Sequence, residues 1–315
     1  MFNGPTAGDL RAPETVADRM LAAHGKSFHW ARRFLGATAA RQATLLYAFC
    51  RLLDDIADGD APGGEVRLRA LDARLAGDQA VHAPEAEAFL RFAAEAGIPV
   101  SAARDLIAGL LFDQGQVLLQ TEAELICYAY QVAGTVGLMM APILGRSDPH
   151  ADAFAVDLGI AMQLTNIARD VLEDAHLNRR YLPALWCADV IPQAIRDSAL
   201  QPDPRIHQTV AEAVEKTLCL AETYYASGLQ GLAYLPLRND AAIAVAACVY
   251  RAIGRRLKAR KYAWWQGRQV VGIGGKIICS LASLPHLAGR NQMRPKHDRH
   301  LHRALKGFDS VTALH

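Results

Sequence analysis

The sequence predicts an all-α protein with a single domain. Long segments rich in Ala, Leu, Arg and Glu carry apolar residues at intervals of three or four, which is the spacing of a helix with one buried face. Very few runs alternate with a period of two, the pattern of a half-buried strand. Short breaks that contain Pro or Gly separate the segments, at 62–64, 97–99, 147–149, 202–204 and Pro236.

Length and composition support one domain rather than two. The chain has 315 residues, of which 51% are hydrophobic, so it can bury a large core. No low-complexity linker divides it. We expect the domain to span residues 1–290, followed by a basic and flexible tail at residues 291–315.

Net charge and cysteine content exclude several classes of function. A formal charge of +2 gives no electrostatic case for nucleic-acid binding. The six cysteines lack CxxC spacing, and the start of the chain does not read as a secretory leader. These features predict neither disulfides nor a zinc site, and they indicate a cytoplasmic location.

Two acidic stretches, RLLDDIAD at 51–58 and QLTNIARDVLED at 163–174, give the strongest chemical signal. In each, side chains with oxygen ligands recur at i, i+4: Asp54 and Asp58 in the first, and Asn166, Asp170 and Asp174 in the second. At about 100° per residue, this spacing keeps each set on one helical stripe. Two such stripes can face each other across a cavity.

The acidic residues lie inside apolar segments, LLYAFCRLLDDIAD and VDLGIAMQLTNIARDVLED, which read as core. A buried carboxylate must be paired or bind a metal, whereas either stretch alone could be a solvated helix face. Mg²⁺ takes oxygen ligands and commonly bridges carboxylates to a substrate phosphate. We therefore predict Mg²⁺, with Mn²⁺ as the alternative, and a diphosphate substrate. Ionisation of an allylic diphosphate in an apolar cavity would begin prenyl carbocation chemistry.

Basic and apolar segments near the C-terminal end bear on membrane contact. Residues 251–261 and 294–306 are rich in Arg and Lys and could touch anionic lipid, although a solvated helix face and a frayed tail explain them as well. The apolar stretch 270–284 contains Lys276 and is shorter than the roughly 20 residues that span a bilayer. We expect no spanning anchor, and peripheral contact with the inner face of the membrane stays open.

Four motifs in order, YAFCRLLDDIAD, YAYQVAGTVGLMM, QLTNIARDVLED and RRYLP, resemble the squalene/phytoene synthase family. The resemblance runs from HGKSFHWA at 24–31 through YRAIGRRL at 250–257 and is strongest to the bacterial phytoene synthases. It implies the isoprenoid-synthase fold with a central apolar cavity. It also implies head-to-head condensation of two geranylgeranyl diphosphates to 15-cis-phytoene through prephytoene diphosphate, in carotenoid biosynthesis. The final cation loses a proton instead of taking hydride, so no NADPH is expected, and downstream carotenoid enzymes are candidate partners.

The resemblance also implies roles for individual residues. The expected metal ligands are Asp54, Asp55, Asp58, Asn166, Asp170 and Asp174. The expected catalytic residues are Asp54, Asp58, Asp170, Asp174 and Tyr181. The expected substrate-binding residues are Ser27, Tyr47, Arg51, Arg179, Arg180, Tyr250 and Arg268.

Some of these assignments leave alternatives open. Helical spacing places Tyr47 and Arg51 on the first metal face, where a guanidinium offers forked donors to phosphate, but Arg51 could instead pair with Asp55 alone. Tyr250 lies in an apolar run and could be a core residue with a satisfied hydroxyl. Of Arg179 and Arg180, the sequence does not indicate which faces inward.

Two further segments bear on the apolar cavity. Residues 132–145, VAGTVGLMMAPILG, suit a tunnel wall, although close packing through their glycines explains them equally well. The stretch GLLFDQGQVLLQ keeps Asp113 of a family motif but has Leu118 and Leu119 where arginine and tyrosine are expected. Tyr128 or Tyr130 could supply the missing phenol.

Three alternatives to phytoene synthesis remain. A C30 synthase would make dehydrosqualene, squalene or hydroxysqualene from farnesyl diphosphate, and sequence does not show the tunnel depth that separates the two. A non-catalytic scaffold on the same fold would have no need of the metal ligands. A head-to-tail prenyltransferase usually carries DDxxD in both motifs, and the NxxxDxxxD spacing here argues against it.

Overall fold

The computed structural model describes residues 35–58, 63–269, 271–282 and 294–314. These residues are mainly helical, and among them the sole extended pairing is an isolated bridge between Leu118 and Arg180. The elements are α3 (Ala37–Ala57), α4 (Gly64–Leu75), α5 (Pro84–Ala96), α6 (Val100–Phe112), α7 (Glu122–Ala129), the π-helix η1 (Tyr130–Gly134), α8 (Thr135–Ile143), α9 (Ala151–Arg169), α10 (Val171–His176), α11 (Ala184–Cys187), α12 (Pro192–Leu200), α13 (Pro204–Gly228), η2 (Leu229–Tyr234), α14 (Leu237–Ala259), η3 (Trp264–Gln266), α15 (Ile273–Ala282), η4 (Arg299–Leu305) and α17 (Asp309–Thr312). The all-α expectation is confirmed.

The breaks read from the sequence coincide with helix ends. Pro204 occupies the first turn of α13, where a missing N–H costs nothing, and the Asp203 carboxylate accepts hydrogen bonds from the first free backbone amides. Gly97 ends α5 in the left-handed region at φ 68°, a conformation that favours glycine. Local chemistry therefore positions these helix ends.

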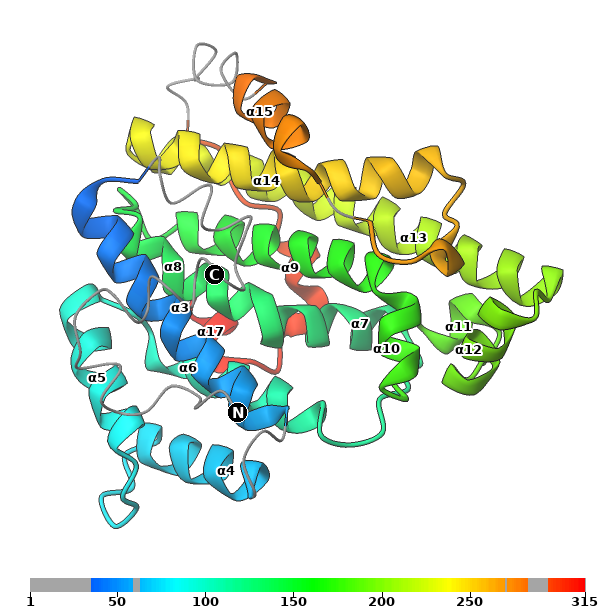
Figure 1. The fold of residues 1–315 in the computed structure, drawn as a ribbon. Helices are drawn as coiled ribbons and strands as arrows, with labels where there is room; N and C mark the ends of the chain where they lie inside the picture. Colours follow the sequence, from blue (N-terminus) through cyan, green and yellow to red (C-terminus); the bar gives the residue numbers. More distant parts are fainter. Residues whose placement is uncertain (1–34, 59–62, 270, 283–293, 315) are drawn as a thin grey trace.

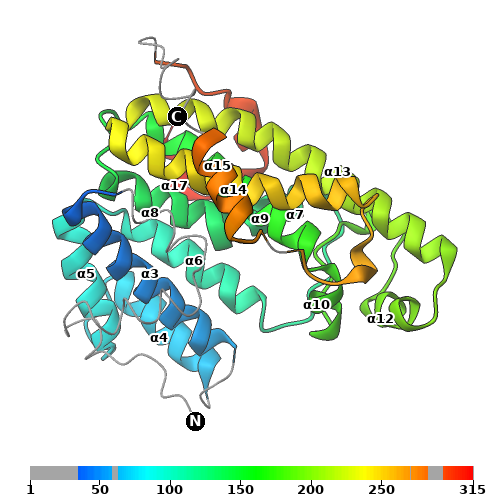
Figure 2. The same ribbon diagram turned by 45° about the horizontal axis from the view of Figure 1, so that its top comes forward.

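Helix α9 lies at the centre of the described fold, surrounded by α8, α13 and α14 (Figures 1 and 2). Most of its residues are buried on every side, as expected for a helix without a solvent-facing stripe. The continuous helix formed by η1 and α8 approaches α9 very closely at two glycines. A Cβ on Gly137 would lie 2.1 Å from the Ala155 carbonyl oxygen, and one on Gly159 would lie 2.3 Å from that of Ala133. Close packing thus accounts for Gly137.

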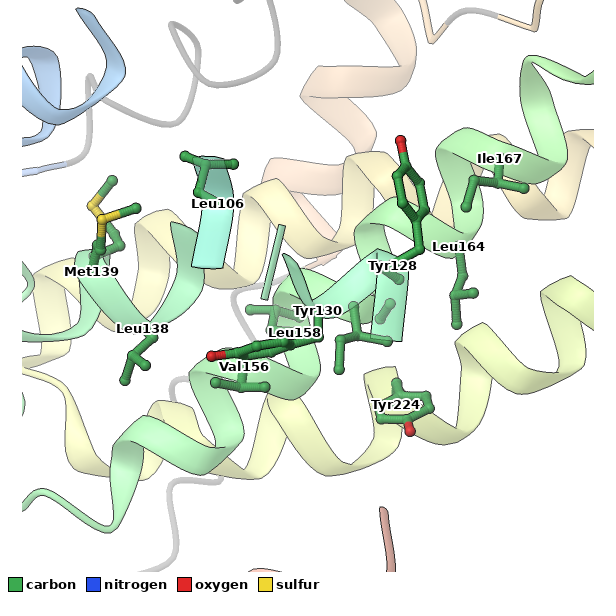
Figure 3. Close-up of a cluster of buried hydrophobic side chains, with 14 of the residues drawn as sticks. Leu106, Tyr128, Tyr130, Leu138, Met139, Val156, Leu158, Leu164, Ile167 and Tyr224 are labelled. Atoms are coloured by element: carbon green, nitrogen blue, oxygen red, sulfur yellow. The ribbon is translucent and has the colours of Figure 1, made fainter. Parts of the chain in front are cut away.

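Helices α7, η1 and α8 form one continuous apolar helix, Glu122–Ile143. In the described part of the chain it is the one helix long and apolar enough to cross a membrane by composition, yet 61% of it is buried inside the protein. The π-helix begins at Tyr130, two residues after Tyr128, a spacing that corresponds to about 200° around a regular helix. Tyr128 and Tyr130 project in different directions within the buried cluster (Figure 3).

The C-terminal segment 294–314 is packed against the helical body, behind α9 in Figure 1. His302, Leu305 and Ser310 are buried. The Tyr224 hydroxyl donates to the Leu301 carbonyl oxygen at 2.8 Å, and the Cys127 thiol donates to that of Ala304 at 3.2 Å. Residues 294–314 are therefore packed on the helical body and do not form the flexible tail expected from their basic composition, because several of their side chains are buried against it. The domain boundary at residue 290 stays a prediction.

Candidate active site

The two acidic stretches occupy the ends of two helices. Asp54 lies in the last turn of α3, and Asp58 caps that helix with its backbone amide 2.8 Å from the Asp54 carbonyl oxygen. Asn166 lies in the last turn of α9, and Asp170 lies at the junction with α10, one turn before Asp174. The i, i+4 stripes expected from the sequence are thus present. At Asp170 the backbone leaves helical geometry, with φ −103° and ψ 18°, so the second stripe continues on a new helix.

Asp113, the C-cap of α6, lies between the two stripes. The pKa of Asp54 is raised to about 7, chiefly by burial, with Arg51 lowering it and the neighbouring carboxylates, Asp113 among them, contributing to the rise. The pKa of Asp174 is raised to about 8, chiefly by burial and then by Asp170 and Asp113. Because Asp113 acts on both groups, the acidic residues of α3, α6 and α10 converge on one region.

Two phenols hold the Asp113 carboxylate. The Tyr128 hydroxyl donates to Oδ2 at 2.7 Å, and the Tyr181 hydroxyl donates to Oδ1 at 2.8 Å. Their rings stack with centroids 4.5 Å apart. Of the two tyrosines proposed to replace a missing phenol, Tyr128 therefore reaches the acidic region, whereas Tyr130 donates to Asp105 on another side of the helix.

Arg179 and Arg180 have different surroundings. Arg179 acts on the pKa values of both Asp113 and Asp174 and lines the cavity beside them. Arg180 is buried, and its guanidinium donates to the Cys187 sulfur and the Leu119 carbonyl oxygen, both at 3.2 Å. Its contacts therefore differ from the diphosphate contact expected for it. Leu119, itself buried, takes part in fixing this arginine.

Arginines already contact the second acidic stripe. Arg169 and Arg268 both form ion pairs with Asp170, the latter at 3.0 Å between Nε and Oδ1. Burial raises the pKa of Tyr250 on α14, whereas Arg169 and Arg268 lower it. The Tyr250 phenol therefore lies near these two arginines. At the first stripe, Arg51 is paired with Asp55. That pairing was the alternative considered for Arg51.

Tyr47 connects the two sides of the region. Burial raises its pKa, Arg51 lowers it, and Asp54 and Tyr250 are among the groups that raise it. The structure thus brings together all the predicted site residues that it describes except Arg180. Ser27 lies outside the described residues.

The donors present fit a hard divalent cation. Asn166 Oδ1 and Glu173 Oε2 are buried side-chain oxygens without a hydrogen-bond partner, and they flank Asp170 in the sequence. The surrounding donors are carboxylate and amide oxygens, which Mg²⁺ and Mn²⁺ prefer. A cavity of about 410 Å³ opens between the end of α3 and the loop after α6, lined by Asp113 and Arg179.

Comparisons with known proteins identify the relatives of this chain. Residues 21–273 match the family model for squalene/phytoene synthase. A 15-cis-phytoene synthase of Enterobacter agglomerans is 36% identical over 82% of this chain and 90% of its own length. A phytoene synthase of Thermus thermophilus is 41% identical over 78% of this chain and 83% of its own length.

Solved structures show the same fold. A dehydrosqualene synthase in complex with ligand superposes with a TM-score of 0.75 at 25% identity, covering 87% of this chain and 96% of the other. The squalene synthase HpnC of Alicyclobacillus acidocaldarius gives a TM-score of 0.68 at 22% identity. From its motifs, its relatives and its fold, the chain belongs to the squalene/phytoene synthase family.

Proposed function

We propose that this protein is a phytoene synthase, a prenyltransferase that joins two geranylgeranyl diphosphates head to head into 15-cis-phytoene. The observation that carries the proposal is the convergence of Asp54, Asp113 and Asp174 from three helices beside an apolar core. Relatives named phytoene synthase over most of the chain support the choice of substrate. No NADPH is required in this scheme, because the final cation loses a proton.

The acidic residues would hold two sets of metal ions. Asp54, Asp55 and Asp58 provide oxygens on one side, and Asn166, Asp170 and Asp174 provide them on the other. Mg²⁺, or Mn²⁺ in its place, would neutralise the diphosphate and make it a better leaving group. The catalytic contribution of this chain is to orient the two diphosphates and to keep water from the cations that form.

The arginines near Asp170 would exchange partners when substrate binds. In the structure, Arg169 and Arg268 neutralise Asp170. A diphosphate offers the same guanidinium groups several oxygens in the forked geometry they prefer. Transfer of Arg268 from Asp170 to the diphosphate would release the carboxylate for metal binding. Arg179, together with Tyr47 and Tyr250, would complete the contacts to phosphate.

The stacked pair Tyr128 and Tyr181 would serve the carbocation part of the reaction. Both phenols donate to Asp113, so their orientation is fixed. Aromatic faces attract a cation by on the order of 0.5–2 kcal/mol each, depending on burial. This pair replaces the phenol that Leu119 does not provide.

Replacing Tyr181 with Phe tests this role. We expect kcat to fall by roughly 10–100-fold, because Asp113 loses one of its two phenol donors while the stacked ring is kept. Steady-state kinetics on geranylgeranyl diphosphate would measure it. Tyr262→Phe is the matched control, since Tyr262 donates to Glu215 on the surface, and it should leave kcat unchanged. Equal kcat values for both variants would contradict the assignment.

Metal binding should depend steeply on pH. With pKa values of about 7 and about 8, Asp54 and Asp174 carry protons in the metal-free protein below those values, and Mg²⁺ must displace them. Affinity for Mg²⁺ should therefore rise by up to about tenfold per pH unit for each displaced proton between about pH 6 and about pH 8. Calorimetry in buffers of different ionisation enthalpy would count the protons released. Asp54→Asn should reduce that count by about one, and a pH-independent affinity would contradict the prediction.

Stability of the metal-free protein should show the opposite dependence. The two carboxyl groups have ordinary pKa values near 3.8 when unfolded and raised values when folded. Between these limits the folded state binds more protons, so the free energy of unfolding falls as pH rises from about 4 to about 8. Thermal unfolding in chelator across this window would show it, and added Mg²⁺ should restore stability at the upper end.

A C30 activity on farnesyl diphosphate is the second candidate, favoured by the structural likeness to a dehydrosqualene synthase. Purified protein and Mg²⁺ should be incubated with geranylgeranyl diphosphate and, separately, farnesyl diphosphate, with and without NADPH. A C40 hydrocarbon formed without NADPH supports the proposal, and a C30 product alone contradicts it. If substitution of Asp54 and Asp170 left function in vivo intact, that result would instead support a non-catalytic scaffold.

A cytoplasmic protein in peripheral contact with the membrane would suit a hydrocarbon product, which downstream carotenoid enzymes could take up there. The supporting features are exposed Ile278 on α15 and the basic end of α14, where Arg255, Lys258 and Arg260 are exposed. Flotation with vesicles that contain anionic lipid tests this. Binding that is absent at low salt would contradict it.

A further inference from the structure

A buried cluster of one carboxylate and two imidazoles lies where the C-terminal segment crosses α9. His297 Nε2 is 2.8 Å from Oδ2 of Asp157, and His302 Nε2 is 2.9 Å from Oδ1. The side chains of Asp157, His297 and His302 are 0%, 7% and 1% exposed. One ligand atom from each lies within 4.8 Å of the others. Three ligating groups therefore converge in an enclosed space from two segments that are remote in sequence.

This cluster is separate from the proposed substrate site. Asp157 precedes Asn166 by nine residues on α9, which corresponds to about 13 Å along the helix axis and half a turn around it. The two side chains thus leave α9 on opposite faces. The red C-terminal segment runs behind α9 in Figure 1. Diphosphate binding therefore does not account for the cluster of Asp157, His297 and His302.

The donors differ in chemistry from those of the substrate site. Two imidazole nitrogens and one carboxylate oxygen suit zinc and related transition ions, whereas Mg²⁺ prefers oxygen donors alone. The histidines are spaced H-x₄-H, within the range common in zinc ligand pairs. Cysteine spacing excluded a zinc site of the cysteine type, and it does not bear on a site made of His and Asp.

The surroundings of the cluster would orient these ligands. The Ser227 hydroxyl of α13 donates to Asp157 Oδ2 and would fix the carboxylate from behind. Phe154, one turn before Asp157 on α9, stacks edge-on against the His297 ring with centroids 5.1 Å apart. The two imidazole rings have centroids 4.5 Å apart, so they lie next to each other beside the carboxylate. The three potential ligands are thus held close together by their surroundings.

We propose that Asp157, His297 and His302 form a binding site for a divalent transition ion of the zinc class, which fastens the C-terminal segment to α9. Each imidazole would bind through Nε2 as the neutral ring, with its proton on Nδ1, and Asp157 would bind as the carboxylate. The Nε2 hydrogen bonds to Asp157 would be replaced by bonds to the ion, and an enclosed water would complete its four-coordinate shell. The site is structural, since it lies away from the substrate cavity.

The test is metal binding by the full-length protein. After dialysis against chelator, the protein in excess Mg²⁺ is titrated with Co²⁺ and, separately, Zn²⁺. We expect one equivalent of either ion to be retained after gel filtration, with the strong visible absorption of four-coordinate Co²⁺ and a rise in Tm. Excess Mg²⁺ occupies the oxygen-only sites, where Co²⁺ would be six-coordinate and weakly coloured. Retention of less than 0.2 equivalents, about the level of carry-over, would overturn the proposal.

Variants locate the ion. His302→Gln and His297→Gln should each lower the affinity for Zn²⁺ by at least about 10-fold and abolish the absorption of bound Co²⁺. Ser310→Ala is the matched control, because Ser310 anchors the same segment through Asp105 without offering a ligand to the cluster. It should retain full metal binding. Unchanged binding in both histidine variants would overturn the assignment and leave an Asp–His hydrogen-bonded contact.

Discussion

Asp54→Asn and Asp170→Asn are each expected to lower kcat on geranylgeranyl diphosphate by on the order of 10³-fold, equivalent to about 4 kcal/mol in the activation free energy. Each removes a charged metal ligand from one of the two acidic stripes and leaves an amide of nearly the same shape. Because both residues belong to one cooperative site, the double variant should lose little more than either single variant. Product formation from radiolabelled substrate at saturating Mg²⁺ would measure the rates.

Stability separates this result from misfolding. The pKa of Asp54 is raised because its charge is buried, so a neutral amide removes a destabilising charge at pH 8. The Asp54→Asn variant should therefore unfold at the same or a higher temperature than the wild type in chelator. Asp148→Asn is the matched control, since Asp148 is a surface group paired with Arg294, and it should keep full activity. Wild-type kcat in the Asp54 and Asp170 variants would contradict the metal assignment.

Gly159→Val is expected to lower the free energy of unfolding by roughly 3 kcal/mol or more. A Cβ at Gly159 would lie 2.3 Å from the Ala133 carbonyl oxygen and 2.8 Å from the Gly134 Cα. These are backbone atoms of η1 that cannot rotate away, so η1 and α9 must move apart. Since α9 carries the second acidic stripe, activity should fall together with stability. Urea or thermal unfolding would measure the change.

Gly272→Ala is the control for that substitution. A Cβ there meets no atom within 4 Å, so we expect a change below about 0.5 kcal/mol. If Gly159→Val unfolded at the same temperature as Gly272→Ala, the close contact of α8 with α9 would be wrong. Gly137→Val should behave like Gly159→Val, because its Cβ would also meet backbone, at Ala155.

The sequence predicted the helical fold and much of the grouping of residues at the candidate site because both depend on local spacing. Asp54 and Asp58, or Asp170 and Asp174, lie one turn apart in any helix, so their common stripe could be read without a structure. Proline and glycine likewise predicted helix ends, as at Pro204 and Gly97. The path of residues 294–314 could not be predicted in this way. Their side chains are buried against helices that are remote in sequence, such as α7 and α13.

Contacts between segments limited the prediction of the site. Arg179 and Arg180 are adjacent and chemically identical. They differ in their contacts because the Arg180 guanidinium donates to Cys187 and to Leu119, which other segments bring close. The contribution of Tyr128 depends on its hydrogen bond to Asp113 at the end of α6, a contact between segments that sequence spacing does not show. In the stretch GLLFDQGQVLLQ, Asp113 still matches the family motif although Leu118 and Leu119 do not. That match was the sequence signal for this part of the site.

The contact of Asp157 with the C-terminal segment has a consequence for synthesis of the chain. His302 follows Asp157 by 145 residues, so at about 5–20 residues per second the ribosome adds it roughly 7–29 s later. During that interval α9 can form, but the Asp157 carboxylate has no imidazole from which to accept a hydrogen bond. It therefore stays in contact with water. The central helix of the fold therefore reaches its buried state late, and a nascent chain stalled before residue 297 should expose the α9 surface to chaperones and proteases.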